Sequence, residues 1–389
     1  MKIFVTVLVC LCGFDVAAMS MPGPRRENQQ WLDVSSQWVY AKRWQKPVIR
    51  TGEYRQSDIS MGNPAVSVAR GHVYIATADG DIEARSITTG EIVWRRLLKT
   101  PFASALGLVK VGGIERLLVG GLSGSFSALD PASGETSWEI ALKGLVLAPP
   151  TAWEDMIFLQ TSQGRVVAVA GDTGETRWSL NGPEPRGLTI YGHSGITVCG
   201  DRVVTGYVDG SVSAYEAKTG TALWTRRISG EGEFRDVDAT PVCSDDRVYT
   251  ASYSDGVVAM ALDDGRVTWR LPQRAVVAMA LDGERVIAVS AEGVLLLLNA
   301  SDGHKLVRTS FASGPISILH VHRGTIAFAA GDNGLLVFDA KEGKPLQASF
   351  LGSRIEGGMG ADGDVLSVLV GNGTLALFRL GGVPEIKKE

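Results

Sequence analysis

The chain has 389 residues, of which 45% are hydrophobic and 21% charged, and its formal net charge is −4. Lys and Arg (38) nearly balance Asp and Glu (42), which argues against a nucleic-acid-binding protein, because such proteins carry a clustered basic excess. This length is large for one domain, but arrays of repeats grow as one continuous structure without splitting.

The N-terminal residues have the features of an export signal. Lys2 supplies a minimal positive region, and residues 3–11 form an apolar run that is far too short to span a bilayer. Two outcomes stay open: cleavage after Ala18 would release a soluble protein, whereas lipid modification of Cys12 would anchor the chain. The residues directly before Cys12 are larger than those that a lipoprotein signal prefers. We expect residues 1–18 to be a signal peptide or lipoprotein signal.

The next segment is basic and contains three tryptophans. We interpret residues 19–55 as an N-terminal extension and linker, in which Trp31, Trp38 and Trp44 help to close or cover the domain that follows. Residues 56–382 are expected to form that single domain, and residues 383–389 form a charged C-terminal tail.

A glycine-centred turn recurs eight times at intervals of 37 to 46 residues. The turns are Ala78-Asp79-Gly80, Leu122-Ser123-Gly124, Ser162-Gln163-Gly164, Val208-Asp209-Gly210, Ser254-Asp255-Gly256, Ala291-Glu292-Gly293, Asp332-Asn333-Gly334 and Gly371-Asn372-Gly373. Each lies between two short apolar runs, as in a two-residue hairpin whose glycine takes a positive φ. A fixed period of this length predicts an all-β, eight-bladed β-propeller with one four-stranded blade per repeat.

A second motif follows each of five turns in phase. It is Ala-x₅-Gly-x₃-Trp, found at Ala84-Gly90-Trp94, Ala128-Gly134-Trp138, Ala168-Gly174-Trp178, Ala214-Gly220-Trp224 and Ala259-Gly265-Trp269. The glycine turns the chain between the third and fourth strands, and the flat indole can fill the wedge between neighbouring sheets. The motif is lost in the last three repeats. Val307 and Gln347 replace the tryptophan in two of them, and the final repeat of the chain runs into the tail. It resembles the tryptophan-docking repeat of PQQ-like (quinoprotein) propellers.

Two cysteines remain after the signal. Cys199 and Cys243 occupy matching places at the ends of the innermost strands of neighbouring blades. Equivalent points on adjacent blades are expected to lie beyond the Cα separation of about 7 Å that a disulfide can bridge, so we expect two buried apolar side chains.

Few residues suggest catalysis or metal binding. The His320-x-His322 pair lacks a third ligand, and no nucleophile elbow or phosphate loop occurs. We therefore expect no catalytic, cofactor-binding or metal-binding residues.

Two extended connections between blades stand out, residues 179–192 and 225–238. They follow Trp178 and Trp224 at nearly equal offsets, so they should leave adjacent blades on the same face. The first offers Leu188, Ile190 and Tyr191, and the second offers Asp236 and Asp238 at an exposed loop end. Apolar anchors beside paired carboxylates suit protein recognition. The alternative stays open that Leu188 and Ile190 start a strand and Asp236 caps a turn.

The stretch Asp-Val-Asp-Ala-Thr-Pro-Val at residues 236–242 is similar to the central region of the BamB family, and so are residues 206–214 and 224–229. The resemblance extends through the repeats over roughly residues 60–380 and is sharpest between residues 140 and 270.

The resemblance implies a non-catalytic scaffold on the periplasmic face of the outer membrane of a Gram-negative bacterium. It implies binding to the POTRA domains of the barrel-forming subunit BamA, help in the insertion of outer-membrane proteins, and membrane attachment by a lipid or by membership of the complex. Carried over, the family's partner-binding positions are Leu188, Ile190, Tyr191, Asp236 and Asp238. Tyr191 stands where the family has an arginine.

Two other functions remain as alternatives. One is a PQQ-dependent quinoprotein dehydrogenase-like enzyme, although those enzymes are longer and typically use adjacent cysteines beside the quinone. The other is a propeller scaffold for a different envelope partner. A further hypothesis is that an exposed strand edge also recruits unfolded strands of nascent outer-membrane proteins.

Overall fold

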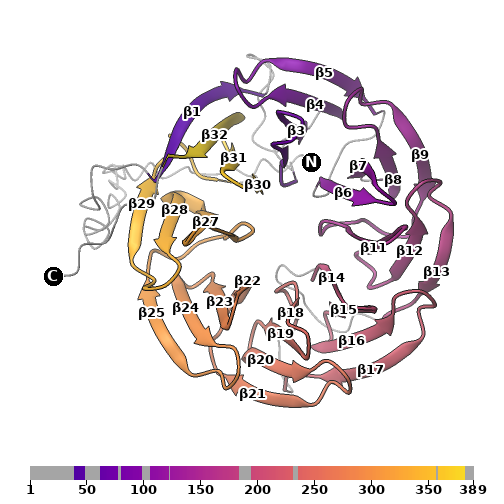
Figure 1. Ribbon diagram of the computed structural model, residues 1–389, viewed down its shortest axis with the longest axis vertical. Coiled ribbons are helices and arrows are strands. Elements are labelled where there is room, and N and C mark those ends of the chain that lie inside the picture. Colours follow the sequence, from indigo (N-terminus) through magenta and orange to yellow (C-terminus); the bar gives the residue numbers. More distant parts are fainter. Residues whose placement is uncertain are drawn as a thin grey trace, which may run out of the picture.

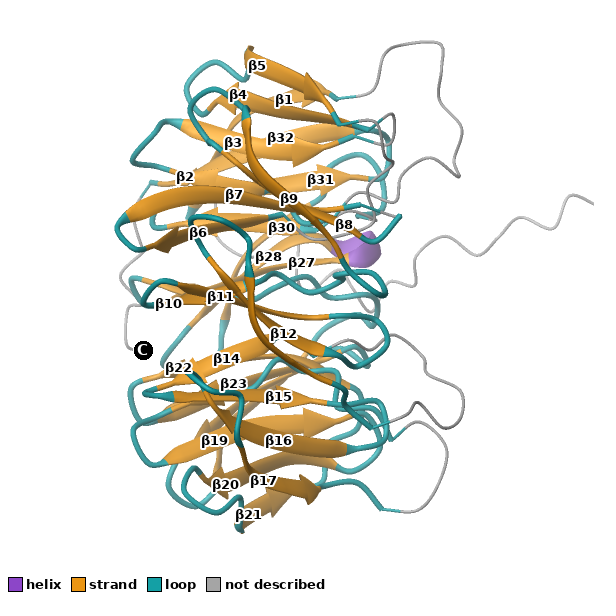
Figure 2. Ribbon diagram, turned by 90° about the vertical axis from the view of Figure 1, so that its right-hand side faces the viewer, coloured by secondary structure: helices purple, strands orange, loops and turns teal. Residues whose placement is uncertain are grey.

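The structure, a computed structural model, describes residues 39–48, 62–77, 80–98, 106–121, 123–183, 194–230, 235–355 and 358–381. Eight four-stranded antiparallel sheets surround a central axis as blades (Figure 1), which confirms the all-β, eight-bladed propeller. Viewed from the side, the ring is a disc with loops on its two faces (Figure 2). In the described ranges, no helix is both long and apolar enough to cross a membrane.

In the first seven blades the strands run in chain order from the inside of the ring to the outside (Figure 1). The first four blades are β2 (Ala65–Ser67), β3 (His72–Ala76), β4 (Asp81–Ser86) and β5 (Ile92–Leu97); β6 (Gly107–Val111), β7 (Ile114–Gly120), β8 (Ser125–Leu129) and β9 (Thr136–Ala141); β10 (Thr151–Trp153), β11 (Met156–Gln160), β12 (Val166–Ala170) and β13 (Thr176–Leu180); and β14 (Ile196–Cys199), β15 (Arg202–Gly206), β16 (Ser211–Glu216) and β17 (Ala222–Arg227).

The second half of the ring repeats this pattern, with the outermost strand of the last blade taken from the N-terminal segment. The blades are β18 (Val242–Cys243), β19 (Arg247–Ser252), β20 (Gly256–Ala261) and β21 (Val267–Leu271); β22 (Val276–Asp282), β23 (Arg285–Ser290), β24 (Val294–Asn299) and β25 (Lys305–Ser310); β26 (His320–His322), β27 (Thr325–Ala330), β28 (Gly334–Asp339) and β29 (Pro345–Ser349); and β30 (Met359–Asp362), β31 (Val365–Val370), β32 (Thr374–Leu380) and β1 (Tyr40–Pro47). One turn of 3₁₀ helix, η3 (Gly331–Asn333), precedes β28.

The recurring turns join the second and third strands of each blade, but they are longer than the sequence suggested. In the fourth blade, Tyr207 N–H bonds Ser211 O (2.9 Å) and Gly210 N–H bonds Tyr207 O (3.1 Å), so three residues form the loop. Gly210 has φ 82°, as the turn requires. The positive φ is therefore confirmed, whereas the two-residue loop is wrong, because a three-residue hairpin with a terminal left-handed glycine fits the strand twist equally well.

The ring is closed by pairing β1 with β32. β1 lies within residues 19–55, which the sequence led us to interpret as extension and linker, so part of that segment belongs to the propeller. Trp44 in β1 donates its indole N–H to Ile87 O (2.8 Å) in the first blade. The eighth blade therefore has its docking tryptophan, supplied from the opposite end of the chain. Pairing between residues so far apart in sequence leaves no local signal.

Docking tryptophans join neighbouring blades in a regular way. The indole N–H of Trp94 donates to Pro131 O (3.1 Å) in the next blade, and a Cβ on Gly134 would lie 2.6 Å from the same indole. Trp138, Trp178, Trp224 and Trp269 make the equivalent N–H bonds to the blade that follows each of them. The hydrophobic core accordingly lies between blades, where glycine allows each indole to pack flat against the next turn.

Gln347 occupies the docking position of the seventh blade, and its change from tryptophan has a structural reason. Its amide accepts from Tyr40 N–H (2.7 Å) and donates to Tyr40 O (2.9 Å), so it clamps the closing strand by both backbone groups. Gln347 is 4% exposed, so water could not replace its amide as the hydrogen-bond partner of the Tyr40 N–H and C=O groups.

Replacing Gln347 with leucine is expected to lower the free energy of unfolding by about 2–4 kcal/mol, since it leaves two buried backbone groups unpaired. Urea denaturation measures this change. The matched control is Gln163→Leu, the same substitution at an exposed hairpin residue, which should leave the midpoint unchanged. Equal midpoints for both variants would show that Gln347 does not hold the closing strand.

The two cysteines form a disulfide with a Cα–Cα separation of 6.0 Å, so the expectation of two unbridged side chains is wrong. Cys199 ends β14 and Cys243 ends β18, the innermost strands of the fourth and fifth blades. Innermost strands of neighbouring blades converge toward the axis, so equivalent positions approach one another there more closely than they do elsewhere in the blades.

Candidate functional site

The first long connection links the third blade to the fourth, and the second links the fourth blade to the fifth. Their described flanks are residues 181–183 and 194–195 for the first connection, and residues 228–230 and 235–238 for the second. Leu188, Ile190 and Tyr191 lie outside the described residues, as does Cys12. The described part of the candidate site consists of these flanks and of the hairpins that hold them.

Tyr207, the first residue of the fourth-blade hairpin, meets a flank of each connection. A Cβ on Gly182 would lie 2.3 Å from its ring, so only glycine lets the first connection pass so closely. Its carbonyl accepts a hydrogen bond from Val237 N–H (3.2 Å) in the second connection. The Tyr207 hydroxyl is hydrogen-bonded to that of Tyr215 (2.7 Å), which fixes the ring between the two flanks.

Further hydrogen bonds fix the remaining flanks. Gly195 N–H, at the end of the first connection, donates to Thr240 Oγ1 (3.0 Å), at the end of the second. Gly230 N–H, near the start of the second connection, donates to Asp255 Oδ2 (3.0 Å) in the fifth-blade hairpin. We call this face, formed by the 207–211 and 253–256 hairpins and the flanks just described, the upper face of blades 4 and 5.

Asp236 is buried, and the expectation of two carboxylates at an exposed loop end is wrong. The residue is 2% exposed, and its carbonyl accepts a hydrogen bond from Tyr253 N–H (2.9 Å). The adjacent Val237 is also 2% exposed. Its side chain packs directly against Gly206, where a Cβ would lie 2.3 Å from Val237 Cγ1. Backbone bonds to Tyr207 and Tyr253 draw the segment in between the two hairpins, so it does not project above them.

Asp238 carries the unusual electrostatics of this face. Both of its carboxylate oxygens are buried, and neither has a hydrogen-bond partner among the described residues. Burial, reinforced by the nearby Asp236, raises the pKa of Asp238 to about 7. A buried carboxyl without a partner costs stability, and strongly shifted groups gather at functional sites.

This pKa predicts a pH dependence of stability. Because the folded protein holds the Asp238 proton above the pH at which the unfolded chain releases it, folding is favoured at low pH. This contribution is lost as the pH rises from about 4 to about 7, at no more than about 1.4 kcal/mol per pH unit. Asp238→Asn should therefore be more stable than wild type at about pH 8, with the difference vanishing near pH 4.

Thermal unfolding of wild type and Asp238→Asn across this pH range measures the difference directly. Asp245→Asn is the matched control, because Asp245 is exposed on the far side of β18. A difference between wild type and Asp238→Asn that does not change with pH would contradict the shifted pKa.

The repeats of the sequence contain a signal for Tyr207. Three residues before the turn glycine, the blades carry Thr77, Gly121, Thr161, Tyr207, Tyr253, Ser290, Gly331 and Val370. Tyrosine occurs at this position only in the fourth and fifth blades, whose hairpins hold the second connection. Comparison of the repeats position by position would have found both residues.

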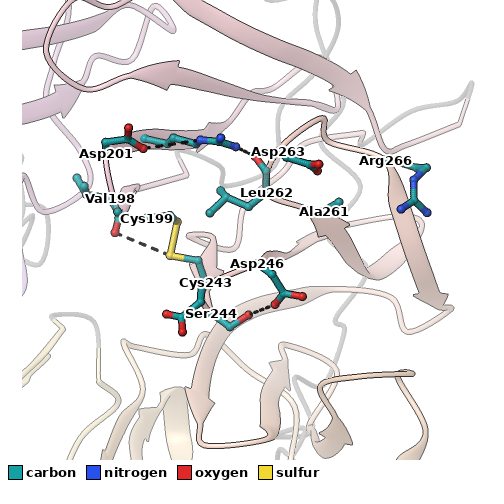
Figure 3. Close-up of a pocket in the computed structure, with 13 residues that line it drawn as sticks. Val198, Cys199, Asp201, Cys243, Ser244, Asp246, Ala261, Leu262, Asp263 and Arg266 are labelled. Atoms are coloured by element: carbon teal, nitrogen blue, oxygen red, sulfur yellow. Dashed lines mark hydrogen bonds and ion pairs between the residues drawn. A yellow bond between two sulfur atoms is a disulfide. The ribbon is translucent and has the colours of Figure 1, made fainter.

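A pocket of about 790 Å³ opens on the opposite face of the same two blades (Figure 3). The Cys199–Cys243 disulfide forms part of its wall, and Arg202, Asp246 and Arg266 are among its charged lining residues. Arg202 already donates to Leu262 O, so its guanidinium supports the blade boundary.

The histidine pair in β26 is likewise occupied by structural contacts. His320 Nε2 is hydrogen-bonded with Gly363 O (2.8 Å), and His322 Nε2 with Asp364 Oδ1 (2.9 Å). Among the described residues, no group of three or more His, Cys, Asp or Glu side chains is arranged to hold a metal ion.

Comparison with known proteins gives a consistent family. The family model described as outer membrane protein assembly factor BamB matches residues 78–303 and 255–378. BamB of Burkholderia pseudomallei is 25% identical over 391 residues, which cover 96% of this chain and 93% of that protein. BamB of Shewanella oneidensis is 31% identical over 218 residues, covering 52% and 55% of the two chains.

Solved structures agree on the fold. The crystal structure of BamB from Moraxella catarrhalis superposes with a TM-score of 0.72 at 20% identity, covering 88% of this chain and all of that one (100%). Quinohemoprotein alcohol dehydrogenase from Comamonas testosteroni gives a TM-score of 0.67 at 12% identity, covering 90% and 78%. The same ring therefore occurs in an assembly factor and in an enzyme, so the fold does not by itself separate them.

Proposed function

This chain belongs to the BamB family of outer membrane protein assembly factors, and on that premise we propose that it is a non-catalytic scaffold of the β-barrel assembly machinery. In this role it would act on the periplasmic face of the outer membrane and help to insert outer-membrane proteins. The partner would be the BamA-type barrel subunit, bound through its POTRA domains.

We place the binding surface on the upper face of blades 4 and 5, with Leu188, Ile190, Tyr191, Asp236 and Asp238 as the contributing residues. One observation carries this placement: between the flanks of two long connections, Asp238 keeps a buried carboxyl group that has no hydrogen-bond partner among the described residues. A basic side chain of the partner would supply the missing charge, and such pairing gives specificity as well as affinity. Because Asp236 is buried, it contributes by positioning the segment. Its charge also raises the pKa of Asp238.

The export of the chain is part of the proposal. Disulfides persist in oxidising compartments such as the periplasm, and Cys199–Cys243 suits that location. Attachment to the membrane would come from lipid modification of Cys12 or from membership of the complex after cleavage near Ala18. Mass spectrometry of the mature N-terminus distinguishes these two forms.

Co-purification tests the proposed function. The C-terminally tagged chain is recovered from mild-detergent envelope extracts, and every protein that accompanies it is identified. We expect the barrel-forming subunit among them. If the folded, abundant protein comes without that subunit but with another envelope protein, the alternative scaffold is correct. If it comes alone and reduces a dye in the presence of calcium and quinone, the quinoprotein alternative is correct.

A further inference from the structure

The Cys199–Cys243 disulfide joins β14 to β18 at the ends of these strands that face the pocket. The proposed binding surface lies at the opposite ends of the same two strands. β14 follows directly after the first long connection, and β18 follows the Asp236–Asp238 segment. Both cysteines are the last residues of these short strands, on the side of the pocket in Figure 3. The bridge thus connects the two strands that position the blade-4 half and the blade-5 half of the upper face.

Noncovalent contacts between these strands are few. Gly195 N–H donates to Thr240 Oγ1 (3.0 Å), Thr197 Oγ1 donates to Pro241 O, and Cys243 Sγ lies 3.8 Å from Val198 O, so a few polar contacts join the two strands and the residues just before them, next to the disulfide. None of these contacts is a backbone ladder, because β14 and β18 belong to different sheets. The disulfide therefore adds a covalent constraint on their separation to these noncovalent contacts.

The bridge is also within reach of thiol chemistry. It forms part of the wall of an open pocket of about 790 Å³. Cys199 is only 4% exposed, while Cys243 is half-buried, so Cys243 is the more exposed of the two cysteines. This pocket opens on the face opposite to the proposed binding surface, so a bound partner would not cover it.

We propose that Cys199 and Cys243 are positioning residues: their disulfide holds the two halves of the upper face in the geometry that binds the partner, and its reduction weakens binding while the ring stays folded. This inference rests on the proposed function. Oxidation is a thiol–disulfide exchange in which a disulfide-carrying oxidoreductase becomes a dithiol as the two cysteine thiols become the bridge. Reduction is the same exchange in reverse, with two electrons and two protons returned to the cysteines.

Linkage gives a test that a merely structural bridge would not pass. If the bridge favours binding, the bound partner must favour the bridge by the same factor. The purified chain is equilibrated in glutathione redox buffers with and without the POTRA domains, and the oxidised fraction is measured by alkylation and mass spectrometry. We expect the partner to shift the thiol–disulfide equilibrium toward the disulfide by roughly threefold to tenfold, matching the change in Kd between the oxidised and reduced forms. An equilibrium that the bound partner does not change would overturn the inference.

Hydrogen exchange separates this inference from the proposed function, because it needs no partner. In the reduced protein, the amides of Gly195 and Val237 should exchange faster, whereas the amide of Val48, bonded to Gly373 O across the ring closure, should not change. Unchanged exchange at Gly195 and Val237 overturns the inference whether or not a partner binds. Faster exchange in a protein that does not bind POTRA domains would instead contradict the proposed function.

The double variant Cys199→Ser/Cys243→Ser should reproduce the reduced protein in both measurements. If it does not fold, reduction of the wild-type chain well below its unfolding temperature supplies the same comparison. Thr197→Val is the matched control, since it removes one hydrogen bond across the same boundary and leaves the bridge. It should change the exchange of Gly195 and Val237 less than reduction does.

Discussion

Replacing Trp138 with alanine is expected to lower the free energy of unfolding by about 3–5 kcal/mol, the usual cost of removing a buried indole. Trp138 is 8% exposed between the second and third blades, and its ring lies 5.9 Å from that of Phe126. Its N–H donates to Gly171 O (3.0 Å), and Gly174 leaves the space that the indole occupies. The alanine variant loses these contacts and leaves a cavity between two sheets. Urea denaturation measures the change.

Two companion variants divide this effect. Trp138→Phe keeps an aromatic ring but removes the donor to Gly171, so its cost should be smaller than that of alanine. Leu97→Ala changes a side chain that is 66% exposed on β5 and should leave the midpoint unchanged. If Trp138→Ala were no more destabilising than Leu97→Ala, tryptophan docking would not be what holds the blades together.

Glu83→Ala is expected to lower the free energy of unfolding by about 3–5 kcal/mol, because it leaves a buried positive charge without its partner. Glu83 is fully buried (0% exposed) and accepts from Arg85 Nε (2.8 Å) and Arg95 Nε (2.8 Å). Arg85 also donates to Pro47 O (3.0 Å), at the end of the closing strand, so the charge cluster supports ring closure. Thermal unfolding and hydrogen exchange of β1 report both consequences.

The control for Glu83→Ala is the exposed ion pair between Lys46 and Glu91, which joins the same two blades. Exposed pairs contribute little to stability, so Glu91→Ala should leave the unfolding midpoint near that of wild type. Equal effects of Glu83→Ala and Glu91→Ala would mean that the buried cluster is not required for the closed ring.

The sequence predicted the repeated parts of this fold well. Eight glycine turns indicated eight blades, and the spacing from Ala128 to Trp138 identified the docking tryptophans, because both signals are local and recur in phase. The contacts that occur once were predicted only in part: Trp44 was expected to help close the domain and does so, but the pairing of its strand was not predicted. β1 pairs with β32 across nearly the whole chain, and Gln347 replaces a tryptophan only because that strand arrives there. A comparison of repeats interprets such a change as decay.

The candidate site was predicted in position more than in detail. Equal offsets from Trp178 and Trp224 placed the two connections on adjacent blades, and their described flanks do meet at Tyr207. The burial of Asp236 could not be predicted, because it depends on bonds to two different hairpins. The disulfide was missed because the sequence does not show how closely innermost strands converge. The roles of Leu188, Ile190 and Tyr191 remain predictions.

The buried carboxyl of Asp238, which has no hydrogen-bond partner in the described part of the chain, points to a balance between stability and recognition. Removing its charge should stabilise the free ring and weaken the complex, whereas a variant that simply damages the fold would lose both. Opposite changes in stability and binding therefore identify a residue kept for its partner. This contrast is sharper than charge reversal at Asp236, where a buried arginine would disturb the fold as well as the surface.

The most direct test of the proposed scaffold is the Kd of the purified chain for the POTRA domains of the barrel subunit, measured by titration calorimetry at about pH 8. Wild type should bind, Asp238→Asn should bind at least about tenfold more weakly while unfolding at a higher temperature, and Asp245→Asn should match wild type in affinity. If folded wild type does not bind, or if the two variants bind equally well, the upper face of blades 4 and 5 is not the binding surface.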